Sequence, residues 1–125
     1  MINDVRIVLS GLWIALMLTY LLGDVLRIFS GDFKPGEISG VPATQAVWMA
    51  AAVLMLIPIV MLVLSLTLNY PLIRWANIIA AVILFGFNLI GLPTYPSLYD
   101  KFLIAVGLVW NVVTVWYAWN WVGEA

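Results

Sequence analysis

The sequence contains no histidine and no cysteine, and only 9% of its residues are charged. Without imidazole and thiolate side chains, it lacks the usual catalytic bases and nucleophiles, the common haem ligands, and the nitrogen and sulfur ligands of zinc. No disulfide can indicate the redox compartment. The net charge of −1 favours neither nucleic acid nor a strongly acidic lipid as a partner. We therefore expect no metal site, no cofactor and no enzymatic activity.

Hydrophobic residues are what the chain has in abundance. They make up 66% of its 125 residues, and the mean hydropathy is +1.14. Because soluble domains carry about 25% charged residues, this composition predicts a membrane protein. A helix needs about 20 residues to cross a hydrocarbon core of about 30 Å. Four crossings therefore use about 80 residues and leave short connections, whereas a fifth does not fit.

The charged residues lie at the borders of four uncharged stretches. This pattern predicts an all-α membrane bundle of four helices in up-down-up-down order, formed by a single domain over residues 1–125. Helices are favoured over a spanning barrel because residues 49–64 are apolar on every face, whereas barrel strands alternate. The expected helices cover about residues 6–28, 44–68, 72–92 and 100–121.

Turn-forming residues set the expected helix ends. Thr44 is expected to cap the second helix, and Pro71 to follow its end because proline has no N–H to continue a helix. Pro58 should kink that helix. Residues 94–97 predict a tight turn, and residues 30–43, with three glycines and two prolines, predict one longer loop on the membrane surface.

Polar and small residues in a membrane bundle tend to face other helices rather than lipid. Their three-four spacing therefore predicts the inward face of each helix. The inward positions are Ser10, Trp13, Met17, Tyr20, Asp24 and Arg27 on the first helix; Thr44, Trp48, Ala51, Met55, Pro58, Leu62, Ser65 and Asn69 on the second; Arg74, Asn77, Ala81, Leu84, Asn88 and Gly91 on the third; and Asp100, Ile104, Gly107, Asn111, Thr114 and Ala118 on the fourth.

Two asparagines lie within the expected spans. Asn111 lies near the middle of the membrane, and Asn88 lies on the antiparallel third helix, close enough for a water or a side chain to bridge the two. One interpretation is that they join helices by hydrogen bonds worth about 0.6 kcal/mol each. The other is a ligand or solute path, whose candidate residues are Met17, Tyr20, Asp24, Asn88 and Asn111.

A second polar group is expected near the membrane surface, at the end of the first helix. Asp24 falls on the same side as Arg27, Tyr95, Tyr99, Asp100 and Lys101. A cluster of Tyr20, Asp24 and Lys101 is geometrically possible, although an Asp–Arg pair at i, i+3 alone would satisfy Asp24. The interpretations are an ion pair that fixes helix ends, a proton- or cation-handling site, and a solvated charge.

The seven tryptophans fall into two groups. Trp116, Trp119 and Trp121 crowd the end of the fourth helix, and Trp75 lies on the same side, as in an aromatic belt at the headgroup level. Trp13, Trp48 and Trp110 lie deeper, where their indole N–H groups need partners. If these three converge, they line an aromatic pocket.

Four segments carry a family resemblance: Leu9–Trp13 (LSGLW), Tyr20–Asp24 (YLLGD), Arg74–Ile78 (RWANI) and Trp116–Trp119 (WYAW). With them the chain resembles, nearly end to end, small prokaryotic four-span membrane proteins known only as a domain of unknown function. The resemblance implies a four-helix bundle in the cytoplasmic membrane and no established reaction. A remoter likeness to DoxX-like proteins concerns architecture only. The matching candidate positions are Tyr20, Gly23, Asp24, Arg74, Asn77, Trp116 and Trp119.

The distribution of basic residues leaves the insertion orientation open. Arg6 and Arg74 lie on the face that holds both termini, and Arg27, Lys34 and Lys101 lie on the opposite face. Because the lysine and arginine bias of short loops sets orientation, this is nearly a tie. One interpretation places both termini in the cytoplasm, and the other is dual insertion with an antiparallel dimer.

Two functional hypotheses are favoured over an enzyme, which would need Asp24, Asp100, Tyr20 or Tyr99 to supply acid-base groups. The first is a non-enzymatic small-molecule or ion binding or transport protein that acts as a homo-oligomer, with a dimer favoured because four packed helices fill their own centre. The second is a structural or accessory subunit that packs against a partner membrane protein. The pairs Ala46 and Ala50, and Ala76 and Ala80, offer small surfaces for close helix approach.

Overall fold

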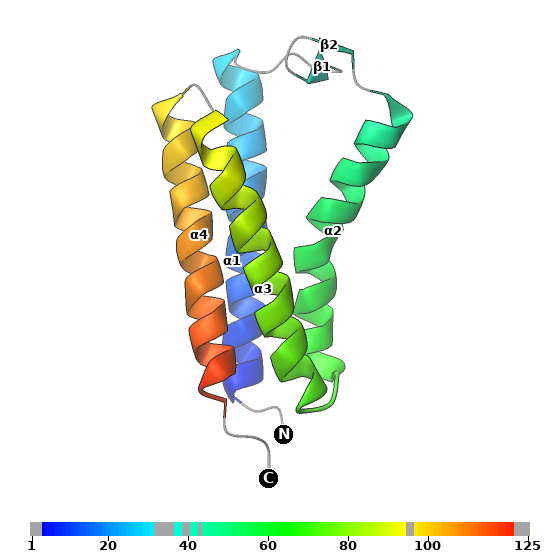
Figure 1. The fold of residues 1–125 in the computed structure, drawn as a ribbon, viewed down its shortest axis with the longest axis vertical. Helices are drawn as coiled ribbons and strands as arrows, with labels where there is room; N and C mark the ends of the chain where they lie inside the picture. Colours follow the sequence, from blue (N-terminus) through cyan, green and yellow to red (C-terminus); the bar gives the residue numbers. More distant parts are fainter. Residues whose placement is uncertain (1–3, 32–36, 39–40, 43, 95–96, 122–125) are drawn as a thin grey trace.

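Four long helices dominate the structure (Figure 1). The computed structural model describes residues 4–31, 37–38, 41–42, 44–94 and 97–121. The helices are α1 (Asp4–Ser30), α2 (Gln45–Thr67), α3 (Leu72–Gly91) and α4 (Leu98–Trp119). Each is long and apolar enough to cross a membrane. The prediction of an all-α four-helix bundle is confirmed, and the ends lie within two residues of those expected.

Local chemistry explains where several helices begin and end. The Thr44 hydroxyl accepts a hydrogen bond of 3.3 Å from the backbone N–H of Val47, as an N-cap does. Gly31 follows the last residue of α1 with φ +84°, a conformation that glycine adopts without a Cβ penalty, and its N–H donates to the carbonyl of Ile28. The capping role predicted for Thr44 is therefore confirmed.

The connection between α1 and α2 contains a small element that the sequence did not predict. Strands β1 (Glu37–Ile38) and β2 (Val41–Pro42) pair antiparallel within the expected loop. A short 3-10 helix, η1 (Leu92–Thr94), follows α3. The turn expected over residues 94–97 lies partly outside the described residues.

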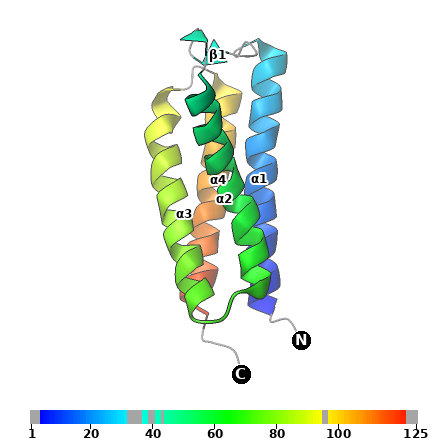
Figure 2. The same cartoon turned by 90° about the vertical axis from the view of Figure 1, so that its right-hand side faces the viewer.

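Helix α2 departs from the bundle in its first half (Figure 1), and in the perpendicular view this helix faces the viewer (Figure 2). Residues 44–53 are all exposed, whereas Pro58, Met61 and Ser65 in the second half are buried. The helix changes direction near its middle, where Pro58 removes the hydrogen bond to the carbonyl four residues earlier. The inward stripe predicted for α2 is therefore wrong before its middle: Thr44, Trp48 and Ala51 are exposed.

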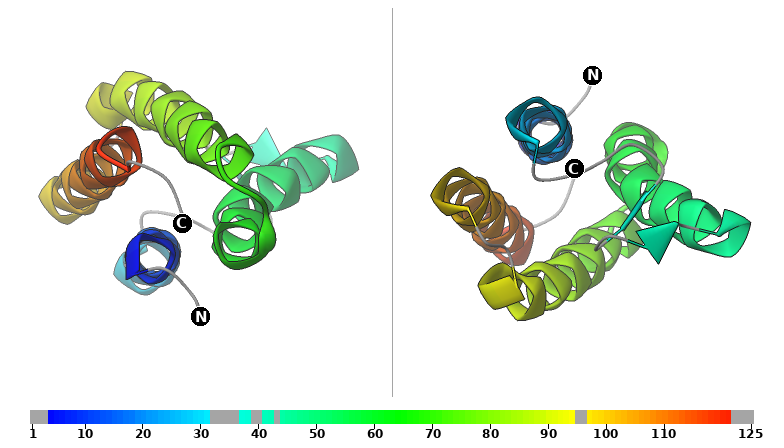
Figure 3. Two further views of the ribbon diagram at one scale, coloured as in Figure 1. Left: turned by 90° about the horizontal axis from the view of Figure 1, so that it is seen from below. Right: turned by 90° about the horizontal axis from the view of Figure 1, so that it is seen from above.

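The core lies between α1, α3 and α4, joined by the second half of α2. Viewed along the bundle, α2 runs outward from one corner while the other three helices stay together (Figure 3). The start of α1 and the end of α4 lie at the same end of the bundle, which we call the terminal end; the opposite end is the loop end (Figure 1). The largest fully buried apolar side chains are Trp13, Leu9, Leu16, Ile73 and Leu84.

Candidate functional site

A hydrogen-bonded centre joins α1, α2 and α3 in the terminal half of the bundle. The Trp13 indole Nε1 donates to Asn77 Oδ1 at 2.7 Å, and Ser65 Oγ lies 3.3 Å from Asn77 Nδ2. Asn77 Nδ2 also donates to the carbonyl of Ile73 at 2.9 Å. Trp13, Asn77 and Ser65 are buried. Because this centre satisfies its own polar atoms, Asn77 ties helices together.

Two arginines bind the carbonyl ends of neighbouring helices at the terminal end. Arg6 donates to the carbonyl of Ser65 at 3.0 Å. Arg74 donates to the carbonyls of Ala118 and Trp119 at 3.0 and 2.9 Å. The last four carbonyls of a helix have no hydrogen-bond donor within the helix. The two arginines therefore supply donors to carbonyls in the last turns of α2 and α4. Arg74 also lies 5.4 Å from the centre of the Trp119 ring, a cation–π contact.

The middle of the bundle brings three of the five path candidates together. Asn88 Nδ2 donates to the Tyr20 hydroxyl at 2.7 Å and to the carbonyl of Leu84 at 2.8 Å. Asn111, only 1% exposed, also lies near that hydroxyl. However, neither its Oδ1 nor its Nδ2 completes a hydrogen bond with a described residue. Tyr20 is thus the side chain between the two asparagines.

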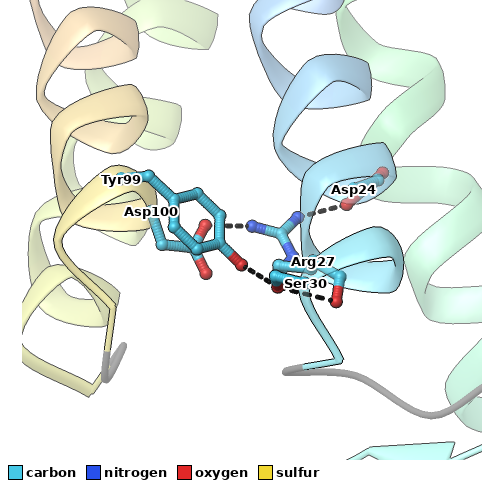
Figure 4. Close-up of polar contacts among 5 residues, drawn as sticks. All are labelled: Asp24, Arg27, Ser30, Tyr99 and Asp100. Atoms are coloured by element: carbon cyan, nitrogen blue, oxygen red, sulfur yellow. Dashed lines mark hydrogen bonds and ion pairs between the residues drawn. The ribbon is translucent and has the colours of Figure 1, made fainter.

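At the loop end, Arg27 joins α1 to α4 (Figure 4). Its guanidinium pairs with Asp24 on its own helix and with Asp100 Oδ1 on α4 at 2.5 Å. The Asp100 side chain is 1% exposed and that of Asp24 is 48% exposed. A Cβ at Gly23 would lie 3.3 Å from Arg27 Nη1, so the missing side chain leaves room for the guanidinium. The Tyr99 and Ser30 hydroxyls lie 2.7 Å apart beside this cluster.

The remaining site residues predicted from the sequence are Met17, Lys101 and Tyr95. Met17 is half-buried, one turn before Tyr20. Lys101 is exposed, and the cluster of Tyr20, Asp24 and Lys101 does not form, because Tyr20 bonds to Asn88 and Asp24 pairs with Arg27. Tyr95 lies outside the described residues.

The tryptophans also divide differently from the prediction. Trp116 and Trp119 are exposed on α4, whereas Trp121 is buried. The three deeper indoles do not converge into the aromatic pocket that was one possibility: Trp13 donates to Asn77, Trp110 donates to Thr19 Oγ1 at 3.1 Å, and Trp48 is exposed on the departing half of α2.

A groove of about 430 Å³ lies between α3 and α4, and the sequence did not predict it. It opens on the outer surface of the bundle. Its lining residues are Val82, Phe85, Asn111, Val112, Val115, Trp116 and Trp119. The available signal was the apolar spacing of Val112, Val115 and Trp119 beside an asparagine, but each of these apolar residues alone is typical of a lipid-facing position. The groove places the unpartnered amide of Asn111 next to an apolar, aromatic surface.

Two chemical classes of site can be compared on this geometry. In the described part of the chain, no three acidic residues gather in a group able to hold a metal ion. The two paired carboxylates at the loop end share one guanidinium. Asp100 Oδ2 and the Trp121 indole Nε1 are also buried without a hydrogen-bond partner, but among the described residues only Asn111 combines an unused donor group with an unused acceptor. The middle of the bundle is therefore suited to an uncharged polar group.

Comparison with known proteins gives a match to one family. The model of a family of unknown function, DUF6326, covers residues 2–125. No curated protein and no solved structure matches the chain. The expected likeness to a four-span family of unknown function is thus confirmed, and the remoter likeness to DoxX-like proteins finds no support.

Proposed function

The chain belongs to the DUF6326 family, whose function is unknown, and from this premise we propose that it is a non-enzymatic membrane protein that binds a small molecule within the bilayer. The proposal rests on Asn111. Leaving a buried donor or acceptor without a partner costs about 1–3 kcal/mol. A bound molecule that offers both a donor and an acceptor removes this cost.

The position of Asn111 supports binding from the membrane rather than from water. Asn111 precedes Trp119, the last residue of α4, by eight residues, which is about 12 Å along a helix. Polar residues at such depth are costly and tend to mark functional positions. Tyr20 and Asn88 are hydrogen-bonded to each other. They therefore lie beside Asn111 while its amide keeps an unused donor group and an unused acceptor.

The charged residues support a non-enzymatic role. An enzyme that used acid-base chemistry would need free carboxylates. Asp24 and Asp100 are the two carboxylates in the polar group predicted near the end of the first helix. Both pair with Arg27, and the pair with Asp100 joins α1 to α4. We therefore assign the loop-end cluster to holding the helices together.

Replacing each asparagine by leucine tests the proposal. In Asn111→Leu, we expect a protein at least as stable as the wild type, because an unsatisfied amide is exchanged for an apolar group of similar size. In the matched variant Asn88→Leu, the hydrogen bond to Tyr20 is lost and stability falls. Native mass spectrometry of lipid-solubilised protein should show a retained small molecule in the wild type and in Asn88→Leu, but not in Asn111→Leu.

The opposite pattern contradicts the proposal. If Asn111→Leu unfolds more easily than Asn88→Leu and retains the same small molecule, Asn111 is a structural residue.

A second candidate, an accessory or oligomeric role, is favoured by the departing half of α2. Residues 44–53 are exposed and include Ala46, Ala50, Ala51 and Ala52, whose small side chains permit close approach of another helix. We propose that a second copy, forming a homodimer in the cytoplasmic membrane, covers this segment. A partner membrane protein is the alternative.

Cysteine cross-linking separates these possibilities, because the natural chain contains no cysteine. In membranes, Ala46→Cys should form a disulfide-linked dimer, whereas the control Ile79→Cys on the outer face of α3 should not. A cross-link from Ala46→Cys to a different protein would instead support the accessory role. Absence of any cross-link from Ala46→Cys would contradict both.

A further inference from the structure

The groove between α3 and α4 is open to lipid along its length. The rims are exposed side chains: Val82 on α3 is 55% exposed, and Trp116 and Trp119 on α4 are each 60% exposed. Its volume of about 430 Å³ falls within the range of small-molecule pockets, about 300–1,000 Å³. A molecule dissolved in the bilayer therefore has lateral access to it, without crossing the bundle.

Asn111 forms the inner edge of this groove. Its polar atoms have no hydrogen-bond partner among the described residues. The residue lines the groove, and its side chain also lies near the Tyr20 hydroxyl. The terminal torsion of asparagine has a broad energy minimum. A small rotation therefore turns the amide from the Tyr20 side toward a molecule in the groove.

The lining residues restrict the chemistry of that molecule. None of them is charged, and a charge this deep in hydrocarbon is strongly unfavourable, so the molecule is neutral. Phe85, Trp116 and Trp119 present aromatic surfaces that favour stacking or edge contacts with another ring. An asparagine amide is satisfied most simply by a hydroxyl, because one hydroxyl both donates to Oδ1 and accepts from Nδ2.

We propose that the groove between α3 and α4 binds an uncharged, membrane-dissolved aromatic alcohol, with its hydroxyl on Asn111 and its ring between Phe85 and the two tryptophans. This inference rests on the proposed binding function and adds the place and the chemical class of the ligand. The ligand approaches from the lipid side, and its polar group lies about 12 Å below the level of Trp119.

A pair of photoreactive probes tests this assignment. The first is a phenol that carries an aryl trifluoromethyl-diazirine, and the second is the same molecule with a methyl group in place of the hydroxyl. Both are added to the full chain in lipid nanodiscs, irradiated, and mapped by peptide mass spectrometry. We expect the phenol to label Val82, Val112 and Val115 saturably and at about tenfold lower concentration than its methyl analogue, equivalent to about 1.4 kcal/mol.

Three variants make the result specific. In Asn111→Leu, the two probes should label the groove equally. Val112→Trp should fill the groove and remove labelling by both. Asn88→Leu lies outside the lining and should keep the full preference for the phenol. Equal labelling by the two probes in the wild type would overturn the proposal, and so would an undiminished preference in Asn111→Leu.

The labelling experiment and the test of the proposed function can fail independently. If the wild type retains a small molecule that Asn111→Leu loses, but the groove shows no preference for the phenol, the binding function stands and the groove is not its site. If Asn111→Leu retains the small molecule, the binding function itself fails.

Discussion

Arg27 holds two carboxylates that differ sharply in burial. Asp24 reaches solvent, whereas Asp100 is buried at the start of α4. An ionised group taken out of water is tolerated only when it is paired. The buried Asp100 carboxylate therefore depends on its ion pair with Arg27, while the pair with Asp24 is closer to a surface ion pair, worth about 0–1 kcal/mol.

Removing the guanidinium should reveal this difference. We expect Arg27→Gln to lower the free energy of unfolding by about 3–5 kcal/mol, because it leaves Asp100 buried and unpaired. Adding Asp100→Asn should restore most of that loss, whereas adding Asp24→Asn should not. Unfolding titrations in mixed micelles measure all three. Equal rescue by both second changes would show that burial of Asp100 is not the cause.

The Trp13–Asn77 hydrogen bond offers a second measurement on single residues. A double-mutant cycle of Trp13→Phe and Asn77→Leu should give a coupling energy of about 0.6–1.7 kcal/mol, the range for hydrogen bonds between membrane helices. The control cycle pairs Asn77→Leu with Trp110→Phe, which removes a bond to Thr19 instead. That cycle should be additive within about 0.5 kcal/mol. Coupling of equal size in both cycles would contradict a specific bond.

The sequence predicted buried residues well where a three-four spacing of polar and small residues indicates the inward face of a helix. The inward positions of α1, α3 and α4 include Ser10, Asn77 and Asn111, which are buried. It placed Arg27 and Asp100 in the same interfacial cluster but did not predict their ion pair, because 73 residues separate them. Asp24 is only three residues away, and local spacing therefore favours it. Long-range partners depend on the packing of whole helices, which a residue pattern does not contain.

Helix α2 has the length predicted from its apolar residues, but its first half lies apart from the other helices. The predicted span of about 44–68 agrees with Gln45–Thr67, since apolar length and the surrounding turn residues set the ends. Its direction was not predictable, because α2 is apolar on nearly every face and contains no charged residue. In the first half, no polar stripe distinguishes an inward face from a lipid-facing one, whereas Ser65 marks the inward face of the second half.

Straightening α2 tests the role of its proline. In Pro58→Ala, the backbone regains the N–H that bonds to the carbonyl of Leu54. We expect the first half of the helix to move toward α3. Spin labels attached at Met49→Cys and Ile90→Cys, both exposed positions, report the distance between the two helices by double electron–electron resonance. The distance should shorten in Pro58→Ala and remain unchanged in the control Ile59→Ala; no shift in either would exclude Pro58 as the cause.

At the scale of the whole molecule, the two ends of the bundle carry similar basic charge but use it differently. At the terminal end, Arg6 and Arg74 bind helix carbonyls. At the loop end, Arg27 is neutralised by carboxylates, and Lys101 is exposed. Orientation in the membrane follows the excess of lysine and arginine on the cytoplasmic side, so a small change in charge should have a large effect.

Reporter fusions measure the orientation directly. We expect a C-terminal reporter to be active only on the cytoplasmic side in the wild type. Leu98→Lys combined with Phe102→Lys adds two positive charges at exposed positions of the loop end and should place a fraction of the molecules in the opposite orientation. Activity on both sides in the wild type would instead indicate dual insertion. A wild-type distribution in the lysine variant would show that these charges do not control insertion.

The arginine contacts at the terminal end have a consequence for biogenesis. Arg6 on α1 binds a carbonyl at the end of α2, and Arg74 on α3 binds carbonyls at the end of α4. Each outgoing helix thus carries the group that completes the backbone of the helix returning beside it. A nascent first pair can close its own exposed peptide groups while the second pair is still being translated, so membrane insertion can proceed one hairpin at a time.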